Sequence, residues 1–276
     1  MKISVVIVSY NQGKFLEETI LSVINQDYID KEIILIDGGS TDDSLEIIKK
    51  YKEYFHYWVS QPDNGQSDAI VKGFKICTGE IITWINSDDL LMPNTLELIY
   101  RKSIQVKSVD GVFYGGVYII NDKGQPQERY KYGKFNYFIS KTIGPTICQP
   151  GTFFGKNVYN SIGGINVKLK YGMDYDLFCN FLFSGISFYS TNGYHAKFRR
   201  YSAQKGHSKH FLEISLKETE LTQTKYGFKG SALFNKIVAR MLQVWLRIFN
   251  GYYFITFSYR IAKRRTLKQY FDSMTE

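Results

Sequence analysis

Residues 3–42 read ISVVIVSYNQGKFLEETILSVINQDYIDKEIILIDGGSTD, and this stretch decides the fold. It holds two short apolar runs typical of strands, Ile3–Ser9 and Ile33–Ile36. Between them, apolar residues and one threonine recur at helical spacing: Phe15, Leu16, Thr19, Ile20, Val23 and Ile24. A strand, a helix and a second strand in this order predict a β-α-β unit.

The same alternation continues along the chain. The pattern predicts further elements in this order: a helix around 45–48 capped by Ser40 or Thr41, a strand at 57–59, a helix at about 66–77 and a strand at 81–85. We therefore expect an α/β fold with a Rossmann-like, doubly wound and mostly parallel sheet flanked by helices. Ligands of such sheets bind beyond the carboxyl ends of the strands, here the segments 10–13, 37–42 and 86–90.

The second half of the chain has a weaker pattern. We expect a helix that opens at Pro93, a strand near 111–120, a long polar loop over the site at 121–141 and a helix that begins near Asp174. A length of 276 residues with 44% hydrophobic residues is enough for one large core and an appendage.

Charge is distributed unevenly. Residues 195–276 contain 16 Lys and Arg against 5 Asp and Glu, although the whole chain carries a net charge of only +9. Within this basic part, residues 232–249 form a helical pattern with a wide apolar face, and the uncharged run 248–259 is too short to span a bilayer. The segment fits an amphipathic helix on an anionic membrane surface, or a helix packed on the catalytic domain or a second subunit.

Two further features concern location and partners. The chain runs from Met1 directly into an apolar strand without a signal-peptide pattern, and its three cysteines match no metal spacing, so we expect a cytoplasmic protein with reduced cysteines. The basic tail lacks any nucleic-acid-binding motif, and its aromatic residues do not alternate with Lys and Arg on one face. We therefore expect no nucleic-acid partner.

Acidic residues follow the predicted strands. Asp88 and Asp89 come directly after the strand at 81–85, where paired carboxylates suit Mg²⁺ or Mn²⁺ and leave positions open for diphosphate oxygens. Asp37 ends another strand and can accept a proton from a base or a ribose, and Tyr10 can stack on a flat base. No dinucleotide-binding or P-loop glycine pattern follows the first strand at Ser9.

Taken together, the ordered segments VVIVSYNQ at 5–12, IDGGSTD at 36–42, QPDNGQSDA at 61–69 and NSDD at 86–89 resemble the family 2 glycosyltransferases. The resemblance covers about residues 1–205. It implies a GT-A fold, a nucleotide-sugar donor such as a UDP- or dTDP-sugar, and inversion at the anomeric carbon. It divides the chain into a catalytic domain at 1–215 and a basic, amphipathic helical extension at 216–276. The domain's halves, 1–110 and 111–215, would bind donor and acceptor.

The resemblance also assigns site residues. It places Tyr10 and Asp37 at the base of the donor, Asp88 at its ribose side, Asp68 near the donor sugar or ribose, and Asp89 at the metal. Gly38 departs from the acidic residue that often follows the Asp37 position, which leaves the identity of the base open.

The acceptor side matches less closely. Asp174 corresponds to the family's catalytic base, with Asp176 as the alternative, because Met173 replaces the first acid of the common pair. The resemblance implies that Gln149 contacts the donor or acceptor sugar and Arg199 the diphosphate. Tyr201 stands where the family often has a histidine, so His207 is a substitute candidate for a third metal ligand.

The sequence thus predicts an inverting, metal-dependent glycosyltransferase that acts on a saccharide or lipid-linked acceptor in cell-surface glycan synthesis, in the cytoplasm or at the cytoplasmic face of the membrane. Two alternatives remain: a sugar nucleotidyltransferase, and a nucleotide-sugar-binding module without catalysis. The nucleotidyltransferase usually has a glycine-rich basic loop after the first strand, whereas this chain has only Gly13 and Lys14 there.

Overall fold

The structure is a computed structural model, and it describes residues 1–201 and 209–228. The chain forms two compact units, Met1–Gly227 and Phe228–Glu276. The amphipathic helix predicted at 232–249 lies outside the described residues.

A nine-stranded sheet forms the centre of the first unit, with strand order β3-β2-β1-β4-β8-β6-β9-β5 and with β7 paired to β6. Its strands are β1 Ile3–Ser9, β2 Lys31–Asp37, β3 Tyr57–Ser60, β4 Ile81–Asn86, β5 Leu90–Leu91, β6 Val112–Ile120, β7 Pro126–Tyr130, β8 Phe153–Gly155 and β9 Phe188–Arg199. The long ladders β3-β2-β1-β4 and β6-β9 are parallel, whereas the shorter pairings of β5, β7 and β8 are antiparallel. The mostly parallel α/β sheet is as predicted.

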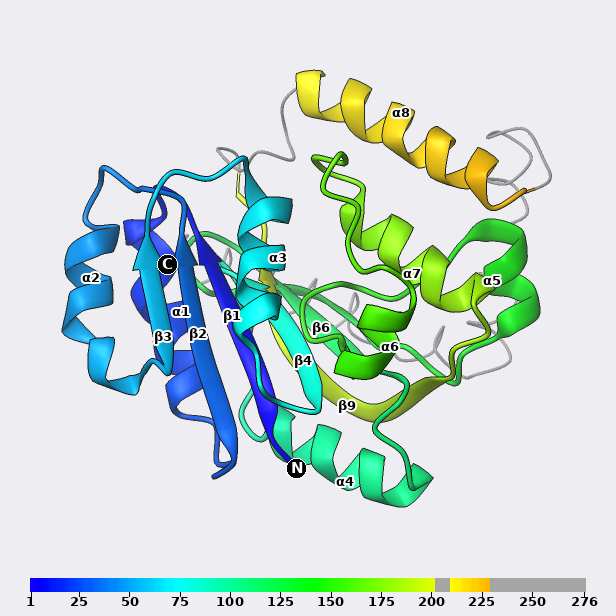
Figure 1. Cartoon of the computed structure of the whole chain (residues 1–276), viewed down its shortest axis with the longest axis horizontal. Coiled ribbons are helices and arrows are strands. Elements are labelled where there is room, and N and C mark those ends of the chain that lie inside the picture. Colours follow the sequence, from blue (N-terminus) through cyan, green and yellow to red (C-terminus); the bar gives the residue numbers. More distant parts are fainter. Residues whose placement is uncertain (202–208, 229–276) are drawn as a thin grey trace, which may run out of the picture. The chain divides into compact units, whose positions relative to one another are not determined.

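Helices cover both faces of this sheet (Figure 1). The helices are α1 Gly13–Ile24, α2 Ser44–Lys50, α3 Gln66–Ile76, α4 Thr95–Val106, α5 Tyr137–Ile143, α6 Lys156–Ser161, α7 Met173–Phe183 and α8 Lys209–Lys225, with a 3-10 turn at Lys52–Tyr54. Apolar residues of α1, α2 and α4 form one core, and those of α3, α6 and α7 form the other.

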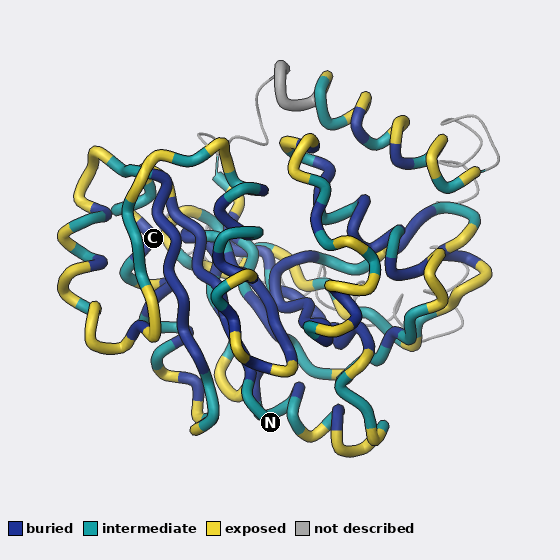
Figure 2. The backbone as a smooth tube through the Cα atoms, in the orientation of Figure 1, coloured by how far each residue is buried: buried dark blue, intermediate teal, exposed yellow. Residues whose placement is uncertain are grey.

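The alternation of side chains along β1 explains the two cores. Val5 and Ile7 point to the core that contains Leu16 of α1, whereas Val6 and Val8 point to the core that contains Phe74 of α3. Because both faces are covered, every residue of β1 is apolar or small and is buried, as Figure 2 shows for the central strands.

The segment 121–141 differs from the predicted loop. It contains the strand β7 and the helix α5, whose N-cap Asn136 accepts a hydrogen bond from the backbone N–H of Ile139 at 3.0 Å. The five residues of β7 are polar or partly exposed, so they show no hydrophobic alternation to reveal an edge strand. The helix α2 also begins later than predicted, with Asp43 in place of Ser40 or Thr41 at its N-cap position.

The predicted boundary at 215/216 falls inside α8, and the first compact unit continues to Gly227. Among residues 1–201 and 209–228, no helix is long and apolar enough to cross a membrane. Cys77, Cys148 and Cys179 are free thiols, as expected.

Candidate active site

The carboxyl ends of three parallel strands lie at one edge of the sheet. Ser9 at the end of β1 pairs with Asp37 at the end of β2, and Val8 pairs with Asn86 at the end of β4. The predicted donor segments that follow these strands therefore meet at the same edge.

The loop after β2 is organised around Asp37. The carboxylate of Asp37 is fully buried and accepts hydrogen bonds from the backbone N–H groups of Gly39 at 3.1 Å and Ser40 at 2.8 Å and from the hydroxyl of Ser60 at 2.7 Å. Gly39 has a φ of +82°, which suits glycine. In this arrangement Asp37 shapes the loop, and its direct contact with a donor base stays a prediction.

Tyr10 stands beside this loop with 54% of its surface exposed, so its ring is accessible for stacking. The next residue, Asn11, ties the two loops together, because its backbone N–H donates to the hydroxyl of Ser40 at 2.8 Å and its side-chain oxygen accepts from the backbone N–H of Thr41 at 2.8 Å. The position of Tyr10 is thereby held against the loop that follows β2.

The acidic pair after β4 is buried. Asp88 is 7% exposed and Asp89 is fully enclosed, with one oxygen of Asp89 accepting from the backbone N–H of Arg199 at 2.9 Å and the other from the amide of Asn86 at 3.3 Å. Burial, followed by the charge of Asp88, raises the pKa of Asp89 well above its ordinary value. Two adjacent buried carboxylates create a local demand for positive charge.

Arg199 meets part of that demand from inside the protein. Its guanidinium is buried, donates to the backbone oxygen of Asp88 at 2.9 Å and to the carboxylate of Glu18 at 2.7 Å, and lies over the ring of Phe15 at 4.5 Å. It also donates to the backbone oxygens of Asn121 and Asp122. Arg199 therefore joins β9 to the acidic loop, and the contact with a diphosphate predicted for it stays a prediction.

Tyr201 extends the same cluster. Its hydroxyl donates to the carboxylate of Asp88 at 3.3 Å and lies 3.2 Å from the amide nitrogen of Gln12, and its ring packs on Phe15 at 5.0 Å between centroids. Thus the phenol of Tyr201 contacts the acidic pair at the position where the family often has a histidine. The substitute candidate, His207, lies outside the described residues.

The predicted donor loop connects to the acidic pair through amides. Gln66, at the start of α3, donates to the side-chain oxygen of Asn86, which in turn donates to Asp89. Asp68, two residues further, accepts from the ammonium of Lys72 at 2.9 Å and from the backbone N–H of Asn64 at 3.0 Å. The hydrogen bond from Asn64 and that from Lys72 lower the pKa of Asp68, so it is held ionised close to this loop.

Asp174 lies in the first turn of α7 and is partly buried. Burial raises its pKa, and a hydrogen bond from the backbone N–H of Tyr175 at 2.7 Å acts in the opposite direction. Asp176, the alternative base, is buried and accepts from the ammonium of Lys225 at 3.0 Å. The two acids of α7 thus have different surroundings, and Asp174 is the one without this cation partner.

Cys148 precedes β8 in the chain. Burial, and after it the charges of Asp89 and Asp174, raise the pKa of its thiol to about 12. The next residue, Gln149, is buried and donates to the backbone oxygen of Trp84 on β4 at 2.9 Å. No role in this site was predicted from the sequence for Gln12, Gln66 or Cys148. Gln12 and Gln66 lie within the segments that resemble the family, but nothing in their local sequence indicates which side chains they contact.

The acidic pair fits a divalent cation by its chemistry. Asp88 and Asp89 supply carboxylate oxygens. The pKa of Asp89 is raised by burial and, after it, by the charge of Asp88, and a cation would favour the ionised form against both. Within residues 1–201 and 209–228, no group of three or more His, Cys, Asp or Glu side chains is arranged to hold a metal ion. The remaining ligands would therefore have to come from a bound diphosphate and water.

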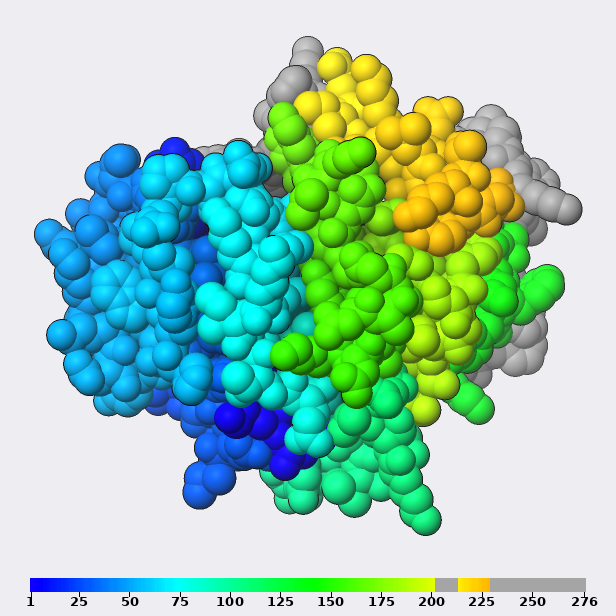
Figure 3. All heavy atoms as spheres, in the orientation of Figure 1, coloured from blue at the N-terminus to red at the C-terminus, as the bar shows by residue number. Residues whose placement is uncertain are grey.

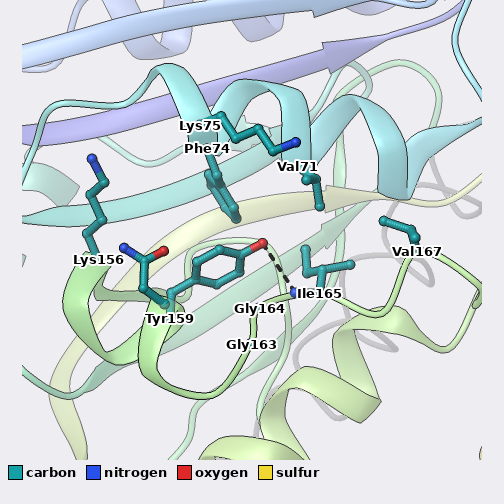
Figure 4. A pocket seen from close by; sticks show the side chains of 10 residues that line it. Val71, Phe74, Lys75, Lys156, Tyr159, Gly163, Gly164, Ile165 and Val167 are labelled. Atoms are coloured by element: carbon teal, nitrogen blue, oxygen red, sulfur yellow. Dashed lines mark hydrogen bonds between the residues drawn. The ribbon is translucent and has the colours of Figure 1, made fainter.

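A separate hollow of about 390 Å³ lies between α3 and the segment from α6 to Val167 (Figure 4). Its lining includes Phe74, Lys75 and Tyr159, whose hydroxyl accepts from the backbone N–H of Ile165 at 3.2 Å. None of the predicted site residues lines it. The hollow is therefore distinct from the acidic cluster.

The buried acids lie at the carboxyl ends of parallel strands, where the ligands of α/β sheets bind. The family model for glycosyl transferase family 2 matches residues 4–163, and the chain belongs to that family. This is the family that the sequence motifs predicted.

Known relatives agree with this class. An uncharacterized glycosyltransferase of Rickettsia typhi is 29% identical over 191 residues, which cover 65% of this chain and 58% of that protein. The chondroitin synthase of Escherichia coli is 27% identical over 186 residues, which cover 64% of this chain and 26% of that protein. The chain thus spans little more than half the length of the first relative and about a quarter of the second.

Among solved structures, residues 1–349 of S. aureus TarS in complex with UDP-GlcNAc match with a TM-score of 0.63 and 18% identity, covering 85% of this chain and 69% of that one. At this identity the likeness shows the fold, and it is the GT-A fold predicted from the sequence.

Proposed function

We propose that the protein transfers a sugar, with inversion, from a nucleoside-diphosphate sugar to a hydroxyl of a saccharide or lipid-linked acceptor in cell-surface glycan synthesis. The observation that carries this proposal is the buried acidic pair Asp88 and Asp89 after β4, at the sheet edge where the strands β1, β2 and β4 end, in a chain of glycosyl transferase family 2. The UDP-GlcNAc complex of TarS supports a donor of the UDP-sugar type, with a dTDP-sugar as the alternative.

In the proposed reaction, the acceptor hydroxyl attacks the anomeric carbon from the face opposite the diphosphate. The carboxylate of Asp174 takes the hydroxyl proton as the new glycosidic bond forms, and the electron pair of the breaking bond leaves with the nucleoside diphosphate. Burial suits Asp174 to this role because it raises the pKa of the carboxyl and so makes it a stronger base.

On the donor side, Tyr10 is proposed to stack on the base, and the loop shaped by Asp37 to surround it. Asp88 and Asp68 would face the ribose and sugar, Gln149 the sugar, and Arg199 would orient the acidic loop by its contact with the backbone of Asp88. Asp89, with Asp88 beside it, would hold Mg²⁺ or Mn²⁺, which stabilises negative charge on the diphosphate when bound.

Turnover with a panel of UDP-, dTDP- and GDP-sugars, with Mn²⁺ or Mg²⁺ and with saccharide and lipid-linked acceptors, tests the proposal. Asp174→Asn and Asp89→Ala should each lower the rate of transfer by at least about 100-fold. The control Asp110→Asn, which changes an exposed acid just before β6, should leave the rate unchanged. Binding of a nucleotide sugar without turnover by the wild type would favour the non-catalytic module. The family membership favours glycosyl transfer over sugar nucleotidyl transfer.

The basic extension is proposed to hold the enzyme at an anionic membrane surface on the cytoplasmic side. The observation behind this is the charge of residues 216–276, which contain 11 Lys and Arg against 4 Asp and Glu. Co-sedimentation with vesicles of phosphatidylglycerol at low salt, compared with vesicles of phosphatidylcholine alone, provides the test. Equal recovery in both pellets would remove the membrane part without affecting the catalytic proposal.

A further inference from the structure

The helix α8 buries polar side chains and exposes leucines, which is not the pattern of a helix held by apolar packing alone. Glu218 and Thr222, one turn apart, are 7% and 2% exposed, whereas Leu216 and Leu221 are 64% and 65% exposed. Burial of a carboxylate is costly unless hydrogen bonds compensate for the lost water. The orientation of α8 therefore depends on what Glu218 contacts.

Glu218 contacts three successive backbone N–H groups. One carboxylate oxygen accepts from Lys170 at 2.7 Å, and the other accepts from Tyr171 at 2.9 Å and from Gly172 at 2.7 Å. These residues immediately precede α7, which begins at Met173 and has no side-chain cap of its own at Gly172. A carboxylate from another helix thus binds the backbone N–H groups of the three residues that lead into α7, where the positive end of the helix favours negative charge.

A second contact joins α8 to the first turn of α7. The ammonium of Lys225 on α8 lies 3.0 Å from the carboxylate of Asp176 on α7. Figure 3 shows the atoms of α8 seated against the segment around α7, and a Cβ on Gly172 would lie only 3.2 Å from the Cβ of Glu218. Asp174 lies between Gly172 and Asp176 along the chain. The helix α8 therefore contacts α7 and the residue before it on both sides of Asp174 in the sequence.

We infer that α8 belongs to the catalytic apparatus and that Glu218 is a positioning residue, which fixes the carboxylate of Asp174 against the acceptor hydroxyl by holding residues 170–172. This inference rests on the proposed role of Asp174 as the base. It extends the functional unit beyond residues 4–163, where the family model matches, to a helix some 50 residues further along the chain.

Steady-state kinetics of the full chain provides the first test, with Glu218→Gln, Glu218→Asp and the control Glu220→Gln on the exposed face of the same helix. Glu218→Gln replaces one acceptor oxygen by an NH₂ group that faces backbone N–H groups. A displacement of a catalytic group by about 1 Å lowers the rate on the order of 100-fold. We therefore expect kcat to fall by about 10- to 100-fold while KM for the donor stays within about twofold. Glu218→Asp, which keeps the carboxylate, should recover part of the loss.

Hydrogen exchange of the same variants provides a readout that does not need turnover. Glu218→Gln should speed the exchange of the amides of residues 170–176 and leave the sheet protected, whereas Glu220→Gln should match the wild type. An unchanged kcat in Glu218→Gln, or a loss of protection spread over the whole domain together with weaker donor binding, would overturn the inference. A wild type without any turnover would instead refute the proposed function, and the exchange data would still decide whether Glu218 orders the loop before α7.

Discussion

At the scale of single residues, the chemistry depends on where a carboxylate lies relative to other charges. Asp174 and Asp176 are two positions apart on α7, yet Asp176 is paired with Lys225 whereas Asp174 is raised in pKa by burial. An acid with a raised pKa and no such cation partner is the better proton acceptor of the two. This difference supports Asp174 as the base over the alternative, Asp176.

The raised pKa of Asp174 predicts a pH dependence. Asp174 accepts a proton only when ionised, so kcat should fall as the pH decreases through its pKa, which lies above the ordinary value of 3.8. The profile of kcat against pH measures the midpoint of this acidic limb. A rate that stays constant down to about pH 4, the ordinary range of an aspartate, would contradict the assignment.

The same shift has a consequence for stability. A carboxyl whose pKa is raised on folding binds its proton more tightly in the folded state, so its ionisation at neutral pH costs stability. Asp174→Asn removes that cost, and we expect a melting temperature at pH 7 equal to or above that of the wild type, although transfer is lost. Thermal unfolding at pH 7 measures this, and a marked drop would indicate that Asp174 has a structural role.

The acidic pair predicts a response to metal. If Asp89 and Asp88 bind Mn²⁺ together with a diphosphate, Mn²⁺ added at a constant concentration of UDP should raise the melting temperature of the wild type, because a ligand at about 100 times its Kd adds about 2.7 kcal/mol to the free energy of unfolding. Asp89→Asn should lose this increase, whereas Asp110→Asn should keep it. Equal increases in all three proteins would place the metal elsewhere.

At the scale of elements, the packing of α3 on the sheet leaves no space for one extra carbon. A Cβ on Gly73 would lie 2.3 Å from Cγ1 of Val6 on β1. Gly73→Ala should therefore lower the free energy of unfolding by about 1–3 kcal/mol, even though alanine favours a helix. Urea unfolding measures the loss, with Lys75→Ala on the exposed side of α3 as the control.

A second substitution tests the cause. Val6→Ala in the Gly73→Ala protein removes the methyl groups in conflict, so the double variant should be more stable than the sum of the two single losses predicts. Additive losses would mean that the contact between α3 and β1 is not the source of the effect.

The elements that the sequence predicted well are those buried on one or both faces. The strands β1, β2 and β4 and the helices α1 and α3 carry clear apolar patterns because their side chains meet a core. β7 lies at the side of β6 and is mostly polar, so hydrogen bonds with β6, which leave no trace in residue type, hold it in place.

At the scale of the whole molecule, the position of the C-terminal boundary decides whether α8 belongs to the catalytic unit. The first compact unit ends at Gly227, after α8, whereas the boundary predicted from the sequence falls at 215, before Glu218 and Lys225. A chain that ends at Gly227 should therefore fold and transfer sugar, and a chain that ends at residue 215 should lose most of its kcat. Equal activity of the two shortened chains would show that α8 is dispensable.

The sequence by itself determined the class of fold, the order of its main elements and the edge of the sheet where the acids gather. These follow from local patterns, because an apolar period and a polar residue at a strand end can be recognised within about ten residues. Tertiary structure decided which partners the charged side chains meet: Asp37 and Arg199 are buried among protein groups, and Glu218 accepts a hydrogen bond from the backbone N–H of Gly172, 46 residues before it. Burial and hydrogen bonding depend on residues far apart in the chain, and no local pattern records them.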